Sequence, residues 1–314
     1  MKNRIFLLIV IILAAASLDT SAQKPDKKQE VRTVTVPISI FTKKELKQKQ
    51  AEEYVQADRL IVKEDKDEQQ ILSIRSVTNS PLSIAFVIQE DLATTFNLQI
   101  KDLKEFIRGL PKGTRVMIAY SRAGSAEIRQ RFTDDLEKAA SSLRIVSGSS
   151  TLAPRSPYSG VSDVLGRFDG VPAGRRALLL FSDGFDTSEG MNLASVAQSF
   201  DLDQATLKAQ RKGVAVYSFY SPTTISNSIN SSLVLAGQGA LEKLSEETGG
   251  RSFSHGSIAP VSYLPFFQDM VLALNRQFSL TYLSTHMKKG YHKLLVQSTN
   301  PEVKIEHPKG YYYR

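Results

Sequence analysis

The stretch that decides the fold is Arg176–Ser188, which reads RALLLFSDGFDTS. Its apolar part, Ala177–Phe181, is typical of a strand that is buried on both faces of a parallel sheet. The run ends in Ser182-Asp183-Gly184, and a second carboxylate follows at Asp186. Ligands of open α/β sheets bind beyond the carboxyl ends of the strands, so these polar residues stand where a site is expected. The same residue types also form turns and helix caps, and this stretch alone does not decide between the two interpretations.

The chain is long enough, and apolar enough, for a large core. It has 314 residues, 41% of them hydrophobic, and no cysteine. Lys2 and Arg4 precede the apolar run Ile5–Ala16, which is short for a membrane span, and small residues follow up to Ala22. This pattern predicts a signal peptide over residues 1–22, cleaved after Ala22, with a retained anchor as the alternative. Export without cysteine suits a bacterial envelope protein, so we expect a secreted or periplasmic location with no membrane span after cleavage.

The net charge of +8 does not indicate a nucleic-acid partner. The basic residues are spread along the chain, in small clusters such as Lys24–Lys28 and Lys288-Lys289. A protein that binds nucleic acid is expected to have a concentrated basic stripe with interleaved aromatic residues. The charge therefore predicts a solvated basic surface.

Hydrophobic periodicity divides the chain into three parts after a polar linker at residues 23–30. Residues 31–78 show the alternation of half-buried strands, and residues 259–314 show a helix followed by the same alternation. Between them, residues 79–258 alternate buried strands with helices, which predicts a doubly wound, mostly parallel sheet. Each end alone offers too few strands for a core. We therefore expect an α/β domain inserted in a small β-rich domain that both chain ends form.

Five short stretches carry a resemblance to the von Willebrand factor type A fold, and specifically to the exported bacterial "VWFA-related" family first described in Acidobacteria. These are VTVPI at Val34–Ile38, EDK at Glu64–Lys66, SDGFDTS at Ser182–Ser188, TGGR at Thr248–Arg251 and KGYY at Lys309–Tyr312. The resemblance covers nearly all of the chain that follows the predicted signal peptide. It implies the same doubly wound fold and a role in protein interaction.

The resemblance also implies a metal-ion-dependent adhesion site, in which three loops hold a divalent cation, usually Mg²⁺. The first loop carries D-x-S-x-S, the second a Thr, and the third the Asp of the S-D-G stretch. Asp183 matches the third element. Carried onto Ile88–Ala93, the first element places Gln89 at the Asp, Asp91 at the first Ser and Ala93 at the second. Ser156 fits the second element, with Thr151 as the alternate.

These departures predict a degenerate site. Gln89 offers only a neutral carbonyl and Ala93 offers no ligand atom, so we expect no resident cofactor and only weak Mg²⁺ binding at Asp183, Asp91 and Ser156. The resulting hypothesis is an exported, non-enzymatic module that binds a protein partner at the carboxyl edge of the sheet. The alternatives are an envelope hydrolase that uses Asp183, Asp186 and nearby hydroxyls, and a scaffold with a dead site.

Other motifs point to no further chemistry at this level. The four histidines have no metal-ligand spacing along the chain, and we expect them at surface or β-domain positions: His255, His286, His292 and His307. Gly237-Gln238-Gly239 lacks the Lys and the preceding strand of a phosphate-binding loop. Tyr311–Tyr313 is predicted to pack on an edge strand.

Overall fold

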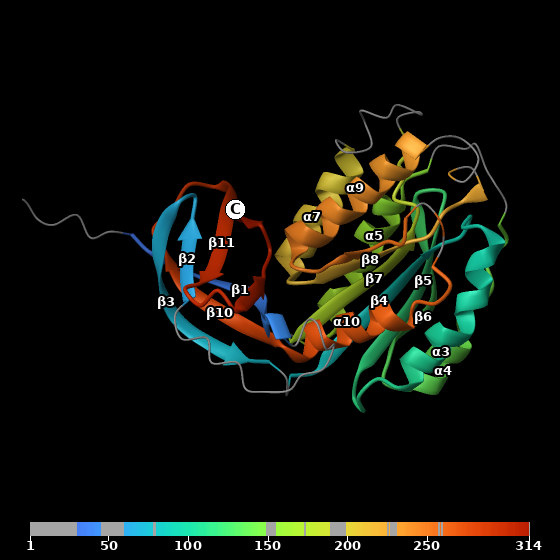
Figure 1. The fold of residues 1–314 in the computed structure, drawn as a ribbon, viewed down its shortest axis with the longest axis horizontal. Coiled ribbons are helices and arrows are strands. Elements are labelled where there is room, and N and C mark those ends of the chain that lie inside the picture. Colours follow the sequence, from blue (N-terminus) through green and yellow to red (C-terminus); the bar gives the residue numbers. More distant parts are fainter. Residues whose placement is uncertain are drawn as a thin grey trace, which may run out of the picture.

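The computed structural model describes residues 30–44, 60–77, 80–148, 155–172, 174–188, 199–224, 226, 231–256, 258 and 260–313. The predicted signal peptide, residues 23–29 of the predicted linker, and Thr151 lie outside the described residues. Within them the chain forms two sheets, one flanked by helices and one antiparallel (Figure 1). No helix in this part of the chain is both long and apolar enough to cross a membrane.

The first sheet has six strands in the order β6-β5-β4-β7-β8-β9. Its strands are β4 (Leu82–Gln89), β5 (Arg115–Arg122), β6 (Ser125–Thr133), β7 (Arg175–Ser182), β8 (Ala215–Tyr220) and β9 (Ser252–Phe253). All pair in parallel except β6, which runs antiparallel to β5 at one edge. The chain builds outward from β4 to β6, then crosses back to β7 on the other side. The topological switch point therefore lies between β4 and β7, where α/β sheets bind ligands.

Helices cover both faces of this sheet because its central strands are apolar on both sides. In β4, Ile84, Phe86 and Ile88 face one core, whereas Ala85 and Val87 face the other. The first core receives α3 (Ile100–Arg108), α4 (Leu136–Ser141) and α10 (Leu264–Asn275). The second receives α5 (Pro157–Leu165), α7 (Phe200–Lys212) and α9 (Ser231–Thr248), as Figure 1 shows. Two short 3₁₀ helices, η1 (Thr94–Gln99) and η2 (Gly166–Gly170), complete the layers.

The second sheet is antiparallel and combines strands from both ends of the chain, in the order β12-β1-β10-β3-β2-β11-β13. Its strands are β1 (Arg32–Thr42), β2 (Leu60–Glu64), β3 (Asp67–Ser76), β10 (Gln277–Ser284), β11 (Gly290–Ser298), β12 (Val303–Glu306) and β13 (Gly310–Tyr313). Strand β1 lies between two C-terminal strands, and β2 pairs with β11. The predicted fold class, an α/β sheet inserted in a β-rich unit made by both ends, is confirmed.

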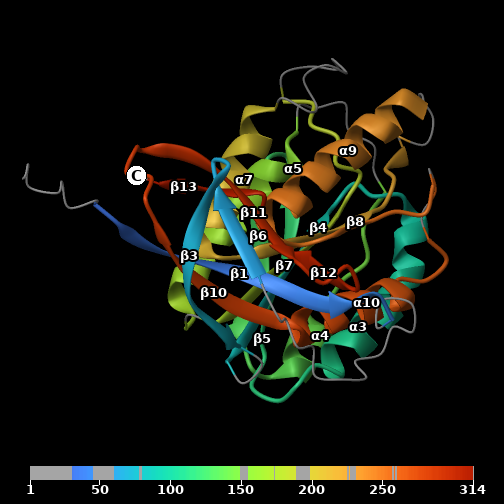
Figure 2. The same cartoon turned by 60° about the vertical axis from the view of Figure 1, so that its left-hand side comes forward.

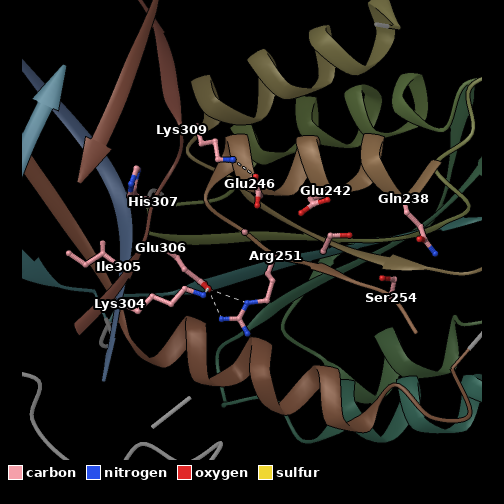
Figure 3. Close-up of a pocket in the computed structure, with 12 residues that line it drawn as sticks. Gln238, Glu242, Glu246, Arg251, Ser254, Lys304, Ile305, Glu306, His307 and Lys309 are labelled. Carbon is pink, nitrogen blue, oxygen red and sulfur yellow. Dashed lines mark hydrogen bonds and ion pairs between the residues drawn. The ribbon is translucent and has the colours of Figure 1, made fainter. Parts of the chain in front are cut away.

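The antiparallel sheet lies beside the helix-flanked sheet (Figures 1 and 2), and specific contacts join the two. Helix α10, which the predicted boundary at residue 259 groups with the C-terminal part, packs in the core of the six-stranded sheet. A polar crevice of 440 Å³ lies between α9, β9 and the β12–β13 segment. Arg251 lies 2.6 Å from Glu306 across this crevice, and Lys309 pairs with Glu246, as the dashed lines of Figure 3 mark. Charged side chains therefore connect the inserted unit to the sheet that the chain ends form.

Candidate functional site

The candidate site lies at the carboxyl ends of β4 and β7, on either side of the switch point. Gln89 is the last residue of β4, and Asp183 directly follows β7. The chain turns sharply after Asp183 because Gly184 has a φ of +70°. A Cβ on Gly184 would lie 2.3 Å from the carbonyl oxygen of Gly237 in α9, so both glycines are needed for this close approach. Gly237 therefore serves helix packing, whereas a Cβ on Gly239, on the other side of Gln238, would meet nothing within 4 Å.

Gln89 connects the two strand ends through its side-chain amide. Its Oε1 accepts hydrogen bonds from the hydroxyl of Ser182, at 2.5 Å, and from the backbone N–H of Asp183, at 3.2 Å. Its Nε2 donates to Oδ1 of Asp91 at 2.9 Å. All these residues are buried. Gln89 thus fixes the position of Asp91 relative to β7.

A buried arginine joins the two carboxylates at this edge. The Arg155 guanidinium donates to Asp183 Oδ2 at 3.0 Å. Its Nε lies 3.1 Å from Asp91 Oδ2, an ion pair outside hydrogen-bond alignment. Asp183 also accepts from the hydroxyl of Thr223 at 2.9 Å and from the backbone N–H of Phe185 at 3.1 Å. The Arg155 side chain is only 7% exposed, so its charge is held inside the protein between two opposite charges.

Burial dominates the electrostatics of Asp183. It raises the pKa of the Asp183 carboxyl above its ordinary value, and the nearby Asp91 carboxylate acts in the same direction. The Arg155 guanidinium opposes both by favouring the charged form. The ionised state of Asp183 therefore depends on the positive charge of Arg155.

Asp186 forms a second, separate cluster. It accepts hydrogen bonds from the hydroxyl of Ser156 at 3.0 Å, from the hydroxyl of Ser199, and from the N–H and hydroxyl of Ser188 at 2.9 and 2.6 Å. Ser156, which the resemblance places beside Asp183, thus donates to Asp186 instead. Among the described residues, the hydrogen-bond partners of Asp183 and Asp186 are an arginine, hydroxyls and backbone N–H groups. The two carboxylates are themselves the groups in these clusters that could act as a base, and both are buried.

Comparison with known proteins gives structural likeness only. No protein-family model and no curated protein matches the sequence. An aerotolerance-related membrane protein from Bacteroides fragilis, solved with multiple mutations to serines, is 14% identical, with 62% of this chain and 98% of that chain covered and a TM-score of 0.45. A von Willebrand factor type A protein from Catenulispora acidiphila is 9% identical, with 91% and 74% covered and a TM-score of 0.44. At such scores no residue's role is transferred to this chain.

The strand order and the antiparallel edge strand are features of this chain itself. The inserted unit has the doubly wound, mostly parallel sheet that the resemblance to the von Willebrand A fold implies. The topology that the short sequence stretches predict is therefore present in the structure.

The residues at this von Willebrand A-type edge do not fit the Mg²⁺ ion that the resemblance implies. Mg²⁺ selects an octahedral set of oxygen ligands. Here a guanidinium already lies between Asp91 and Asp183, and an amide nitrogen of Gln89 donates to Asp91. The side chain of Ala93 carries no ligand atom, and its backbone N–H donates to the carbonyl of Pro222. The edge therefore holds a cationic side chain in contact with its two carboxylates.

Proposed function

We propose that the chain is an exported, non-enzymatic module that binds another protein at the carboxyl edge of its six-stranded sheet. We further propose that Arg155 supplies, as part of the chain, the positive charge that a bound cation would otherwise supply there. The bridge from Arg155 to Asp91 and Asp183 is the observation that carries this proposal. It supports an edge that is assembled and charge-balanced without an exchangeable ion.

The exposed groups at the same edge favour recognition through polar surface contacts. We define the edge rim as five residues: Glu90, Arg122, Ser188, Thr224 and Arg144. The first four end or follow the parallel strands β4, β5, β7 and β8, and Arg144 joins them through its ion pair with Glu90. Glu90 lies 2.9 Å from Arg144 and 3.5 Å from Arg122. Ser188 and Thr224 are exposed. Such a mixed rim of charges and hydroxyls suits a protein partner with polar side chains of both signs.

The hydrolase alternative lacks this kind of support. Hydrolysis by a side-chain nucleophile requires a base within hydrogen-bond reach of it. The hydroxyls of Ser156 and Thr223 do have such a base, because they donate to the carboxylates of Asp186 and Asp183, but both hydroxyls are buried. Both carboxylates are buried, so neither faces a substrate directly.

Export is part of the proposal and is supported by the N-terminal pattern. Lys2, Arg4, the apolar run and the small residues up to Ala22 match a secretory signal, and the chain has no cysteine. Mass spectrometry of the protein from an envelope fraction should find an N-terminus at Gln23. An intact Met1 terminus would instead support a retained anchor.

The rim proposal is tested by cross-linked capture from an envelope extract of the source organism. The test variant is Thr224→Arg, which places a long charged side chain on the rim. The control is Lys112→Glu, an equally exposed position in the turn before β5, at the opposite edge of the sheet. We expect the same protein to be captured by the wild type and the control, and capture to fall at least tenfold in Thr224→Arg.

Two results would contradict the proposal. Capture that survives Thr224→Arg would place the partner elsewhere. Capture lost on adding a chelator, with the thermal midpoint unchanged, would mean that a cation participates at the edge. If no protein is captured by any form, the scaffold interpretation takes the place of the binding module.

A further inference from the structure

A second polar cluster lies in the antiparallel sheet, far along the sequence from the edge rim. Strands β2 and β3 are joined by a tight turn in which Asp65 and Lys66 both have positive φ, at 50° and 84°. Glu64 ends β2, His286 lies in the β10–β11 connection, and His292 lies in β11. Glu64, Asp65, His286 and His292 each bring one potential ligand atom to within 4.8 Å of the others.

Both histidine rings are held by acceptors outside this cluster. His292 Nε2 lies 2.7 Å from the backbone carbonyl of Lys288, and His286 Nε2 lies 3.1 Å from Asp67 Oδ2. A carbonyl or carboxylate oxygen only accepts, so a neutral ring at each position carries its hydrogen on Nε2. The Nδ1 lone pairs then face inward, at 2.7 Å and 3.5 Å from Asp65 Oδ2. On a neutral ring the Nδ1 lone pairs therefore face carboxylate oxygens, and either a proton on Nδ1 or a bound cation must lie between them.

Glu64 adds a buried carboxylate to this convergence. Its side chain is fully buried, and its Oε1 lies 3.3 Å from His292 Nδ1. Oε1 also accepts hydrogen bonds from Arg32, Ser284 and Tyr311, whereas Oε2 is buried without a hydrogen-bond partner. The charge of Arg32 balances one of the three carboxylates Glu64, Asp65 and Asp67. The remaining two negative charges match one divalent cation.

We propose that His286, His292, Asp65 and Glu64 bind a divalent transition-metal cation of the Zn²⁺ class. Two imidazole nitrogens with carboxylate oxygens are ligands that Zn²⁺ prefers over Mg²⁺. Tetrahedral bonds of about 2.0–2.1 Å place ligand atoms about 3.3 Å apart. The contacts of 3.3 and 3.5 Å already have this spacing, and the 2.7 Å contact of His292 with Asp65 opens by about half an ångström when the cation enters.

The outer contacts complete the arrangement expected of a metal centre. Histidine ligands of metals donate their other ring N–H to a carboxylate or a backbone carbonyl, which orients the ring. Asp67 does this for His286, and the Lys288 carbonyl does it for His292. A cavity of 580 Å³, which Asp65, His286 and His292 line, gives access from solvent. The cation would fasten the β2–β3 turn to the β10–β11 connection.

Calorimetric titration of Zn²⁺ into metal-stripped protein tests this site, with Mg²⁺ as the contrasting ion. We expect one Zn²⁺ per chain, a higher thermal midpoint with Zn²⁺, and no Mg²⁺ binding in the same range. His286→Gln and Asp65→Asn should each weaken Zn²⁺ binding at least tenfold. Asp67→Asn, which removes only the outer contact, should weaken it about 10–100-fold. The control His255→Gln removes an exposed histidine outside the cluster and should leave binding unchanged.

The visible absorption of a Co²⁺-substituted sample reports the metal ligands directly and does not depend on the stability of the protein. A four-coordinate band that His286→Gln alters and His255→Gln leaves unchanged would support the assigned ligands. The proposal is overturned if the wild type binds no Zn²⁺, if His286→Gln and Asp65→Asn bind as tightly as the wild type, or if His255→Gln causes an equal loss. Far-ultraviolet circular dichroism of each variant verifies that it is folded. Because two separate ligand variants are used, the test still decides if one of them does not fold.

Discussion

Replacing Arg155 by methionine removes the positive charge between Asp91 and Asp183 while keeping most of the side-chain volume. The three side chains are 7%, 11% and 0% exposed, so the charges interact in the interior. At about 3 Å and an effective dielectric constant near 20, each contact contributes about 5 kcal/mol of attraction, which desolvation largely offsets. Removing one partner leaves the two carboxylates unpaired. We expect the free energy of unfolding to fall by about 3–5 kcal/mol.

Urea unfolding followed by far-ultraviolet circular dichroism measures this loss. Arg122→Met is the matched control, because Arg122 lies at the same edge, is 74% exposed and pairs with Glu90 at 3.5 Å. Its replacement should lower the free energy of unfolding by less than about 1 kcal/mol. Adding Asp91→Asn to Arg155→Met should recover part of the stability, since Oδ1 can still accept from Gln89. A loss for Arg155→Met no larger than that of the control would refute the buried bridge.

Three further predictions follow from the same structure. The loss of unfolding free energy in Arg155→Met should be larger at pH 7 than near pH 3.8. Burial raises the folded-state pKa of Asp183, and loss of the guanidinium raises it further, so stability is lost as pH rises through that pKa. Urea unfolding across this pH range checks the prediction. The Cβ of Gly237→Ala would lie 2.2 Å from the Asp183 carbonyl oxygen, so this variant should lower the free energy of unfolding by about 1–3 kcal/mol. Gly239→Ala in the same helix meets nothing within 4 Å and should raise the free energy of unfolding by about 0.5–1 kcal/mol in the same assay. Arg251→Met breaks a partly buried 2.6 Å contact between the inserted unit and β12 and should lower the free energy of unfolding by about 1–2 kcal/mol.

The fold was predictable because its signals are local. The buried strands β4 and β7 are continuous apolar runs, and each ends where polar residues begin. The alternation in β1 and β11 marks strands with one buried face. The resemblance places Gln89, Asp91, Ser156 and Asp183 together at one edge of the sheet. Hydrogen bonds join Gln89 to Asp91 and Asp183, whereas Ser156 donates to Asp186. Chain order and periodicity are sufficient for this level of description.

The partners within each cluster were not predictable in the same way. Arg155 directly precedes Ser156, yet a search for oxygen ligands passes over a residue that is itself a cation. Its position is decided by the turn into α5, where the backbone of Thr187 pairs with that of Arg155. His292 and Asp65 are 227 positions apart, and only the pairing of β2 with β11 brings them together. Spacing along the chain therefore gives no sign of the histidine cluster.

The two clusters differ in where their positive charge comes from, and this difference separates the two proposals. At the edge, Arg155 is part of the chain, so a chelator has nothing to remove there. In the antiparallel sheet, Arg32 balances only one carboxylate, and the inward nitrogens of His286 and His292 lie 3.5 Å and 2.7 Å from Asp65, where a bound cation can take the place of a proton. A chelator should therefore lower the thermal midpoint of Zn²⁺-loaded protein and leave partner capture unchanged. Loss of both together would mean that the sheet cluster controls the edge, and loss of capture alone would place a cation beside Arg155.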